Sequence, residues 1–285
     1  MLHEFPACLP WLRDLLRSGL QLLAGGLLLG SCQLIEYSPN QAYVPVRERG
    51  QTARNLQLLG AATGTDTVRF VFVGDTQRFY DETEAFVTSV NQQRGIDFVL
   101  VAGDLSDFGL TREFQWVNRR LAALRPPYLT VIGNHDLVGN GRAIYQHVYG
   151  PLNYTFDYAG TRFILLDTNG REDGFGGRVP DLPWLRRQLA DTAGARRTVV
   201  VSHVPPTDED FDPALVSGYT AALRADPRLV FHLSGHVHRF TAGQPFHDGV
   251  SYLTTYSLKK RRYHILTVWG ARQFRLETVA YGLDK

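Results

Sequence analysis

The stretch VRFVFVGDTQ, residues 68–77, is an apolar run that ends in a glycine, an aspartate and, two positions on, a glutamine. Its β-branched and aromatic residues predict a buried strand. Four further apolar runs lead into segments with candidate metal ligands: IDFVLVA runs into GDLSD at 103–107, YLTVI into GNHD at 133–136, RTVVVS into His203, and RLVFHLS into GHVH at 235–238. Open α/β sheets bind ligands beyond the carboxyl ends of their strands, so we expect these five segments to meet.

Seven residues of these segments carry side chains that bind divalent cations: Asp75, Gln77, Asp104, Asn134, His203, His236 and His238. A catalytic zinc usually takes three protein ligands, so seven are too many for one ion. They suit two ions that share one carboxylate, roughly 3.5–4 Å apart, the common arrangement for displacement at phosphorus. His135, next to Asn134, is placed by the sequence to protonate a leaving alkoxide.

Each segment alone has an ordinary structural interpretation. GDTQ could be a strand-to-helix turn in which Asp75 caps the following helix. The two histidines of GHVH could lie in a satisfied loop, and His203 alone carries little information. Five such segments in chain order, each after a predicted strand, favour a metal site.

In these segments the chain resembles the calcineurin-like metallophosphoesterases, whose pattern is GD-x-[H/Q], GD-x-x-D, GNH-[D/E], a lone histidine and GH-x-H. The resemblance implies a first metal held by Asp75, Gln77, Asp104 and His238. It implies a second metal held by Asp104 as the bridging ligand, Asn134, His203 and His236. It also implies that His135 is the general acid and that Asp107 orients its imidazole.

The resemblance extends from about residue 68 to the C-terminal strands. The segments YGPLNYTFDYAGTRFILLDTN (149–169) and WLRRQLA (184–190) are similar to the purple acid phosphatase and cyclic nucleotide phosphodiesterase-like branches. Phe108 follows Asp107 where protein phosphatases of the family carry a phosphate-binding arginine, which argues against that branch. Gln77 stands where many members have histidine. Because an amide oxygen is a harder ligand, we expect Mn²⁺ to be favoured, with Fe, Zn²⁺ or Mg²⁺ as alternatives.

Strands and helices alternate after residue 68, with helices expected near 81–93, 111–124, 183–189 and 219–224. Three alternating segments follow and are antiparallel in character: GVSYLTTYS, RYHILTVWG and QFRLETVAYG. This order predicts a layered α/β domain over residues 67–285. The resemblance sharpens the expectation to an α/β (α+β) fold, a four-layer α/β/β/α sandwich of two packed mixed sheets flanked by helices.

The N-terminal residues suggest export. Arg13 and Arg17 precede LQLLAGGLLL (20–29), an apolar run of signal-peptide length, and LGSC at 29–32 resembles a bacterial lipobox. We therefore expect a lipoprotein signal peptide at 1–31, lipidation of Cys32, a tether at 32–66, and an envelope location facing the periplasm or the cell surface. The alternative is a hydrophobic helix inside the fold, which the glycine pair at 25–26 disfavours.

Composition limits the partners. The chain has 285 residues, 44% of them hydrophobic, which allows a large core. Its formal net charge of +2 lacks the excess of positive charge that is typical of nucleic-acid-binding domains. We therefore expect no sequence-specific nucleic-acid binding. Two loops flank the predicted site: 169–181, where Arg171 and Arg178 are candidate phosphate contacts, and the acidic 205–213. Both also fit solvated connections.

These observations lead to one hypothesis and two alternatives. The hypothesis is a metal-dependent phosphoesterase in which a metal-bridging hydroxide attacks a phosphorylated small molecule or phosphodiester. One alternative is a phosphodiesterase acting on cyclic nucleotides, nucleotides or phospholipid headgroups. The other is a non-catalytic, metal-binding envelope lipoprotein. The sequence leaves the oligomeric state open.

Overall fold

The computed structural model describes residues 38, 40–62, 64 and 66–282. The predicted signal peptide and Cys32 lie outside these residues. All the described helices and strands belong to one compact unit, Ala42–Lys285. No helix among the described residues has the length and apolar character needed to cross a membrane.

Part of the predicted tether belongs to the folded domain. Residues 46–48 form a 3₁₀ turn, η1 (Val46–Glu48), and helix α2 (Gln51–Leu59) follows. Val44 is fully buried, and the Asn55 side chain accepts a hydrogen bond from the Tyr128 backbone N–H at 3.0 Å. Residues 42–66 of the predicted tether thus belong to the same compact unit as the rest of the domain.

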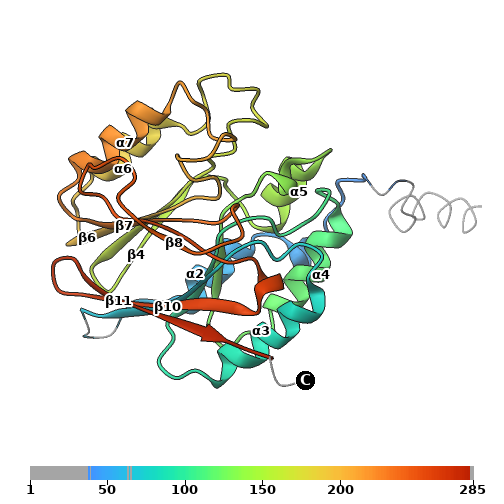
Figure 1. Cartoon of the computed structure of the whole chain (residues 1–285). Helices are drawn as coiled ribbons and strands as arrows, with labels where there is room; N and C mark the ends of the chain where they lie inside the picture. The colour runs from blue at the N-terminus through green and yellow to red at the C-terminus, as the bar shows by residue number, and fades with distance from the viewer. Residues whose placement is uncertain (1–37, 39, 63, 65, 283–285) are drawn as a thin grey trace, which may run out of the picture. The chain divides into compact units, whose positions relative to one another are not determined.

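Two sheets form the centre of the domain (Figure 1). The first has the order β11-β10-β1-β2-β3, with the bounds β11 (Gln273–Ala280), β10 (Arg262–Trp269), β1 (Val68–Val73), β2 (Phe98–Val101) and β3 (Tyr128–Thr130). The second has the order β4-β5-β6-β7-β9-β8, with the bounds β4 (Tyr154–Tyr158), β5 (Thr161–Leu165), β6 (Arg197–Val201), β7 (Leu229–Ser234), β9 (Tyr252–Thr254) and β8 (Thr241–Gly243). Both sheets are mixed, because parallel central strands are joined to antiparallel strands.

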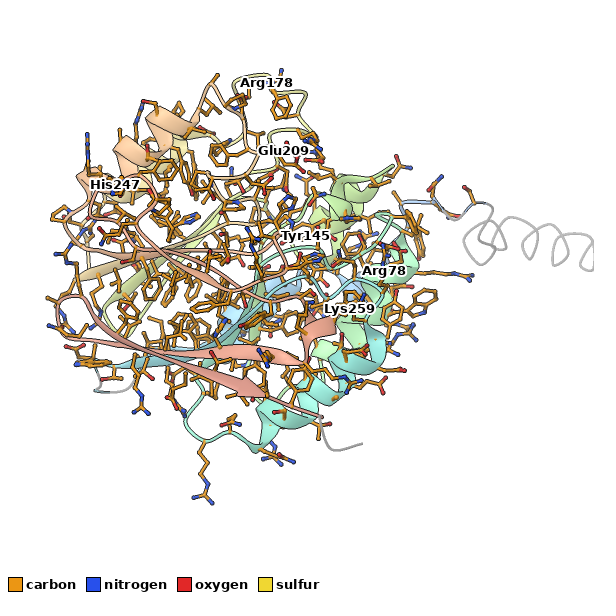
Figure 2. All side chains as sticks on the ribbon, viewed as in Figure 1. Arg78, Tyr145, Arg178, Glu209, His247 and Lys259 are labelled. Carbon is orange, nitrogen blue, oxygen red and sulfur yellow. The ribbon has the colours of Figure 1, made fainter. Side chains whose placement is uncertain are left out.

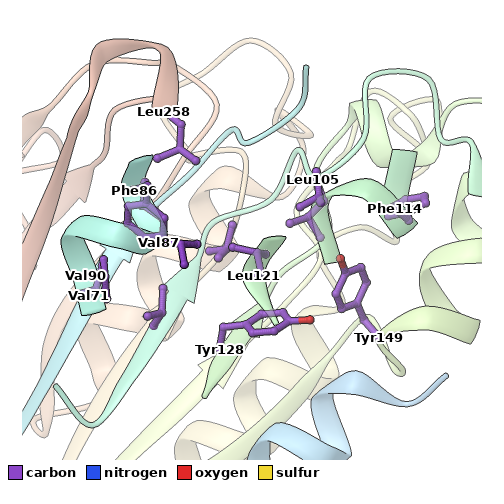
Figure 3. Close-up of a cluster of buried hydrophobic side chains, with 14 of the residues drawn as sticks. Val71, Phe86, Val87, Val90, Leu105, Phe114, Leu121, Tyr128, Tyr149 and Leu258 are labelled. Carbon is purple, nitrogen blue, oxygen red and sulfur yellow. The ribbon is translucent and has the colours of Figure 1, made fainter. Parts of the chain in front are cut away.

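Three apolar clusters hold four layers together. One lies between the first sheet and the helices α3 (Tyr80–Gln92), α4 (Thr111–Leu121) and α5 (Gly141–Val148); Figure 3 shows part of it around Phe86 and Leu121. The second lies between the sheets, where the rings of Phe98 and Phe163 meet edge to face at 5.2 Å. The third lies beneath α6 (Leu182–Ala190) and α7 (Val216–Ala225). The four-layer α/β/β/α prediction is confirmed.

Two details of the predicted order are wrong. The segment containing β9 does not form a series with β10 and β11. It lies in the other sheet, where β9 pairs parallel with β7 and antiparallel with β8. Only β10 and β11 form the expected antiparallel pair. Helix α5, eight residues long, was not expected, since so short a periodic segment gives a weak signal.

Candidate metal centre

The five predicted strand ends meet at one place, three from the first sheet and two from the second. Backbone hydrogen bonds join the segments directly: Asp75 N–H donates to Gly103 C=O at 3.0 Å, and Gly235 N–H donates to His203 C=O at 3.1 Å. The His135 N–H donates to Oδ1 of Asp104 at 3.0 Å. The carboxyl ends of β1, β2, β3, β6 and β7 therefore form one site, as their order in the sequence predicted.

Four predicted ligands form the first half of the site. Nε2 of His238 lies 3.0 Å from Oδ1 of Asp75, and the Gln77 amide lies 3.2 Å from Oδ2 of Asp104. Both Asp75 carboxylate oxygens and Oε1 of Gln77 are buried and receive no hydrogen bond. Buried acceptors without donors are unfavourable unless another group compensates them, and a divalent cation is such a group. These ligand atoms, most of them oxygens, fit a divalent cation.

The second half is built around Asn134. Its Oδ1 lies 3.0 Å from Nε2 of His203 and 3.1 Å from Nδ1 of His236. Nε2 of His203 also lies 3.3 Å from Oδ1 of Asp104. Nδ1 of His203 faces the Ala102 carbonyl at 2.6 Å, which fixes this nitrogen as the N–H and leaves Nε2 free to act as a ligand.

Asp104 lies between the two halves. One carboxylate oxygen faces Gln77 and the other faces His203. Asp75, Asp104 and His203 also bring ligand atoms within 4.8 Å of one another and are all buried. This is the position that a bridging carboxylate requires. The arrangement fits the ligand sets that the family pattern implies, although the roles of the individual residues stay predictions.

The ligand segments adopt unusual backbone conformations. Asp75, Asp104, His236 and His238 all have positive φ values, between 53° and 67°. Residues other than glycine are rarely found there, and such strain concentrates at functional sites. A Cβ atom on Gly133 would overlap the Asp104 carboxylate and its backbone nitrogen. The glycine of GNHD is therefore required so that the third segment can approach the second.

The electrostatic field of the site is negative. Burial alone would lower the pKa of His203, but the carboxylates of Asp104 and Asp75 raise it to about 10. Burial likewise acts to raise the pKa of Asp104, and the nearby His203 holds it below its ordinary value. The Asp75 carboxylate, whose Oδ1 lies 3.0 Å from Nε2 of His238, raises the pKa of His238. A field that stabilises positive charge on imidazoles also attracts a divalent cation.

The predicted acid His135, which follows Asn134 in the chain, has a partly exposed side chain. Its Nδ1 lies 3.0 Å from the Asp107 carbonyl oxygen and 3.7 Å from the Asp107 carboxylate. That carboxylate is instead engaged by Arg78, whose Nε lies 3.1 Å away and whose second guanidinium nitrogen also contacts it (Figure 2 labels Arg78). The sequence analysis missed Arg78, although it directly follows the predicted ligand Gln77.

Asp136 was also missed as a functional residue. Its Oδ1 accepts hydrogen bonds from the backbone N–H groups of Leu105 and Ser106 at 2.9 and 2.7 Å. Its Oδ2 accepts one from the Gly133 N–H at 2.9 Å. The carboxylate thus fastens the GNHD segment to the GDLSD segment. The signal was present in the sequence as the acidic fourth residue of GNHD.

The two flanking loops pair with each other. Arg171 contacts Asp210 at 2.5 Å and Glu209 at 3.5 Å in the acidic loop, whereas Arg178 contacts Asp173 of its own loop at 3.2 Å. The two arginines expected as phosphate contacts are thus held in ion pairs with carboxylates. The acidic loop reaches the site itself, because Asp210 also lies close to His236.

Comparison with known proteins adds to this geometry. Residues 68–240 match a family model described as calcineurin-like phosphoesterase. The chain is 30% identical over 188 residues to the glycerophosphodiester phosphodiesterase GpdQ of Enterobacter lignolyticus, covering 58% of this chain and 66% of the relative. It is 28% identical over 163 residues to a probable cyclic nucleotide phosphodiesterase of Moraxella catarrhalis, covering 52% and 57%.

A solved structure shares the fold. The purple acid phosphatase PPD1 from yellow lupin (Lupinus luteus) seeds is similar with a TM-score of 0.62 and 13% identity, over 77% of this chain and 52% of that chain. The chain covers less than two thirds of the length of either phosphodiesterase relative. The likeness therefore concerns the domain that carries the strand-end site.

Proposed function

The chain belongs to the calcineurin-like phosphoesterase family, and we propose that it hydrolyses phosphoric esters with two divalent cations held at the strand-end site. One observation carries the proposal. Both oxygens of Asp75 and Oε1 of Gln77 are buried acceptors without donors, in a site where Asn134, His203 and His236 also converge. Bound there, two cations would supply Lewis-acid chemistry, activated water and neutralisation of phosphoryl charge.

The chain's own residues divide the remaining tasks. Asp104 orients both halves of the site through its two oxygens. His135 holds a proton for the leaving oxygen, while its Nδ1 N–H is fixed by the Asp107 carbonyl. Arg78 holds the Asp107 carboxylate and so steadies the segment that carries this carbonyl. Asp136 keeps His135 and Asp104 in register by joining their two loops.

The charge of the surroundings favours a diester over a monoester. A phosphomonoester carries up to two negative charges, whereas a diester carries one. Arg78 and Arg171 are each paired with an aspartate that lies close to a histidine of the site, which reduces the positive charge left for a dianion. Both phosphodiesterase relatives support the same preference. We therefore favour a phosphodiesterase.

A pair of chromogenic substrates tests this function. The Mn²⁺-loaded protein should hydrolyse bis-p-nitrophenyl phosphate with a higher kcat/KM than p-nitrophenyl phosphate. The reverse order would favour a monoesterase of the same family. Bound metal without turnover of either substrate would favour the non-catalytic lipoprotein.

The metal preference follows from Gln77. Because its amide oxygen replaces an imidazole at the first half of the site, we propose Mn²⁺ there. Restoring activity to the EDTA-treated protein with Mn²⁺, Mg²⁺, Fe²⁺ or Zn²⁺ in parallel tests the preference. A Gln77→His variant should shift it toward Zn²⁺.

We further propose that Cys32 is lipidated and anchors the chain to the bacterial envelope. The support is the sequence LQLLAGGLLLGSC, with an apolar run of signal-peptide length before the cysteine. Acyl chains on this residue and its new N-terminus would give stable attachment, since a single chain binds membranes only marginally. Labelled palmitate should enter the wild-type chain in cells and not a Cys32→Ser variant.

A further inference from the structure

We propose that Asp208 and Asp210 position His236 as a metal ligand by accepting a hydrogen bond from its Nε2–H group. The inference rests on the proposed function, because it assigns His236 to the second cation. It goes beyond the family pattern, which names His236 and leaves the loop at 205–213 without a role.

The two nitrogens of His236 face different groups. Nδ1 lies 3.1 Å from Oδ1 of Asn134, on the side where His203 also converges. Nε2 lies 3.3 Å from Oδ1 of Asp208 and 3.5 Å from Oδ2 of Asp210. A neutral imidazole that binds a metal through one nitrogen carries its proton on the other, and an acceptor for that proton fixes the tautomer and the ring orientation.

The loop holds these carboxylates in place before any cation binds. Oδ1 of Asp208 accepts a hydrogen bond from the Asp210 N–H at 3.1 Å, and the Asp208 carbonyl accepts one from the Phe211 N–H at 3.2 Å. Phe211 is buried, and its ring lies 5.1 Å from that of Tyr219 on α7. The acidic loop is thus anchored in the apolar layer under α7.

Arg171 completes the arrangement. Its guanidinium contacts Oδ1 of Asp210 at 2.5 Å, and its backbone N–H donates to the Asp210 carbonyl at 3.0 Å. Asp210 therefore presents its other oxygen to His236. The order Arg171–Asp210–His236 parallels Arg78–Asp107–His135, where an arginine also holds an aspartate next to a histidine.

A third cation is the rival explanation. Ligand atoms of Asp208, Asp210 and His236 lie within 4.8 Å of one another, a spacing that a cation could also use. Such a cation would have to bind Nε2 of a ring whose Nδ1 already faces the Asn134 side. Both nitrogens would then be ligands, which requires an imidazolate anion that has lost its last N–H proton. A hydrogen bond from Nε2–H to the carboxylates needs only the neutral ring. We therefore favour the interpretation in which Asp208 and Asp210 orient His236.

Metal titration of the EDTA-treated full chain distinguishes the two. Wild type should bind two Mn²⁺ per chain in calorimetry. The double variant Asp208→Ala/Asp210→Ala should bind one Mn²⁺ as before and the other about 10- to 100-fold more weakly, the usual effect of removing such a partner. The double variant Asp208→Asn/Asp210→Asn keeps acceptor oxygens, so its affinity for the second Mn²⁺ should lie between those of wild type and the alanine variant. Glu209→Gln is the matched control, since Glu209 lies in the same loop, is 88% exposed and contacts Arg171 at 3.5 Å.

A second readout follows the proton itself. In the Zn²⁺-loaded protein, long-range ¹H–¹⁵N spectra should show a protonated Nε2 on His236, with a resonance that moves in the alanine double variant and not in Glu209→Gln. Unchanged affinities for both Mn²⁺ ions in a folded alanine double variant would overturn the role of Asp208 and Asp210 and leave the proposed function standing. Three Mn²⁺ per wild-type chain, reduced to two in the double variant, would establish the third cation instead. No Mn²⁺ binding by wild type would overturn the proposed function.

Discussion

Nδ1 of His135 lies 3.0 Å from the Asp107 carbonyl oxygen and 3.7 Å from the Asp107 carboxylate. The backbone, rather than the side chain, therefore makes the closer contact with the imidazole. The resemblance to the family implied that Asp107 orients this ring. The structure gives the carboxylate a different main partner, Arg78.

The first prediction follows from this contact. Asp107→Ala keeps the carbonyl, so His135 keeps its main acceptor, and kcat should fall only about tenfold or less. His135→Ala removes the proton donor, and kcat for a poor leaving group should fall about 10²- to 10⁴-fold. Steady-state kinetics of both variants with an alkyl ester measure the difference. Equal losses would show that the carboxylate is needed to orient the ring.

The second prediction concerns the leaving group. Protonation matters most when the departing alkoxide is strongly basic, so His135→Ala should affect alkyl esters far more than p-nitrophenyl esters. The variant should still bind both Mn²⁺ ions. A His135→Ala rate that equals wild type for an alkyl ester would remove His135 from the role of acid.

The third prediction tests the close approach of two segments. A Cβ atom at Gly133 would overlap Oδ1 and the backbone nitrogen of Asp104. Gly133→Ala should therefore displace the shared carboxylate and lose both metal and activity, with metal content measured by elemental analysis. Gly243→Ala serves as a control, since a Cβ atom there meets nothing within 4 Å. Full metal content in Gly133→Ala would contradict the proposed placement of Asp104.

The fourth prediction concerns acid stability. His232 is fully buried, and burial lowers its pKa from 6.5 to about 3. The unfolded chain therefore binds this proton near pH 6.5 while the folded chain does not. The free energy of unfolding should fall as the pH drops from about 6.5 toward 3, by an amount on the order of a few kcal/mol from this group. Above pH 6.5 His232 is neutral in both states and should not contribute to the pH dependence of the free energy of unfolding.

Urea unfolding of the metal-free chain across this range measures the slope. His232→Gln cannot be protonated in either state, so its unfolding free energy should depend less steeply on pH between 6.5 and 3. His147→Gln, at an exposed position on α5, is the control and should keep the wild-type slope. Identical slopes for wild type and His232→Gln would contradict the buried, neutral histidine.

Much of the site could be predicted from the sequence because its ligands are tied to strand ends. A buried apolar run followed by a glycine and a ligand residue specifies both an element and a position at the edge of a sheet. The convergence of residues as distant as Asp75 and His238 then follows from sheet topology. The four layers follow in the same way from the order of strands and helices.

The features that the sequence did not reveal depend on contacts across loops. Asp208 and Asp210 lie close to His236 in a loop that Phe211 anchors under α7, and a local sequence pattern does not show such a contact. β9 was misplaced because local alternation does not tell which sheet a strand joins; that choice depends on distant burial. Arg78 was missed because an exposed arginine has no periodic pattern to reveal its partner.

The metal content of the wild-type chain and of Asp104→Asn tests the central claim most directly. Asp104 faces both halves of the site, and its amide replacement leaves one oxygen where two are needed. Wild type loaded with Mn²⁺ and desalted should retain two ions per chain and hydrolyse bis-p-nitrophenyl phosphate. Asp104→Asn should remain folded, retain fewer than one ion per chain and lose at least 99% of the activity. Two ions and wild-type turnover in Asp104→Asn would contradict the binuclear site described above.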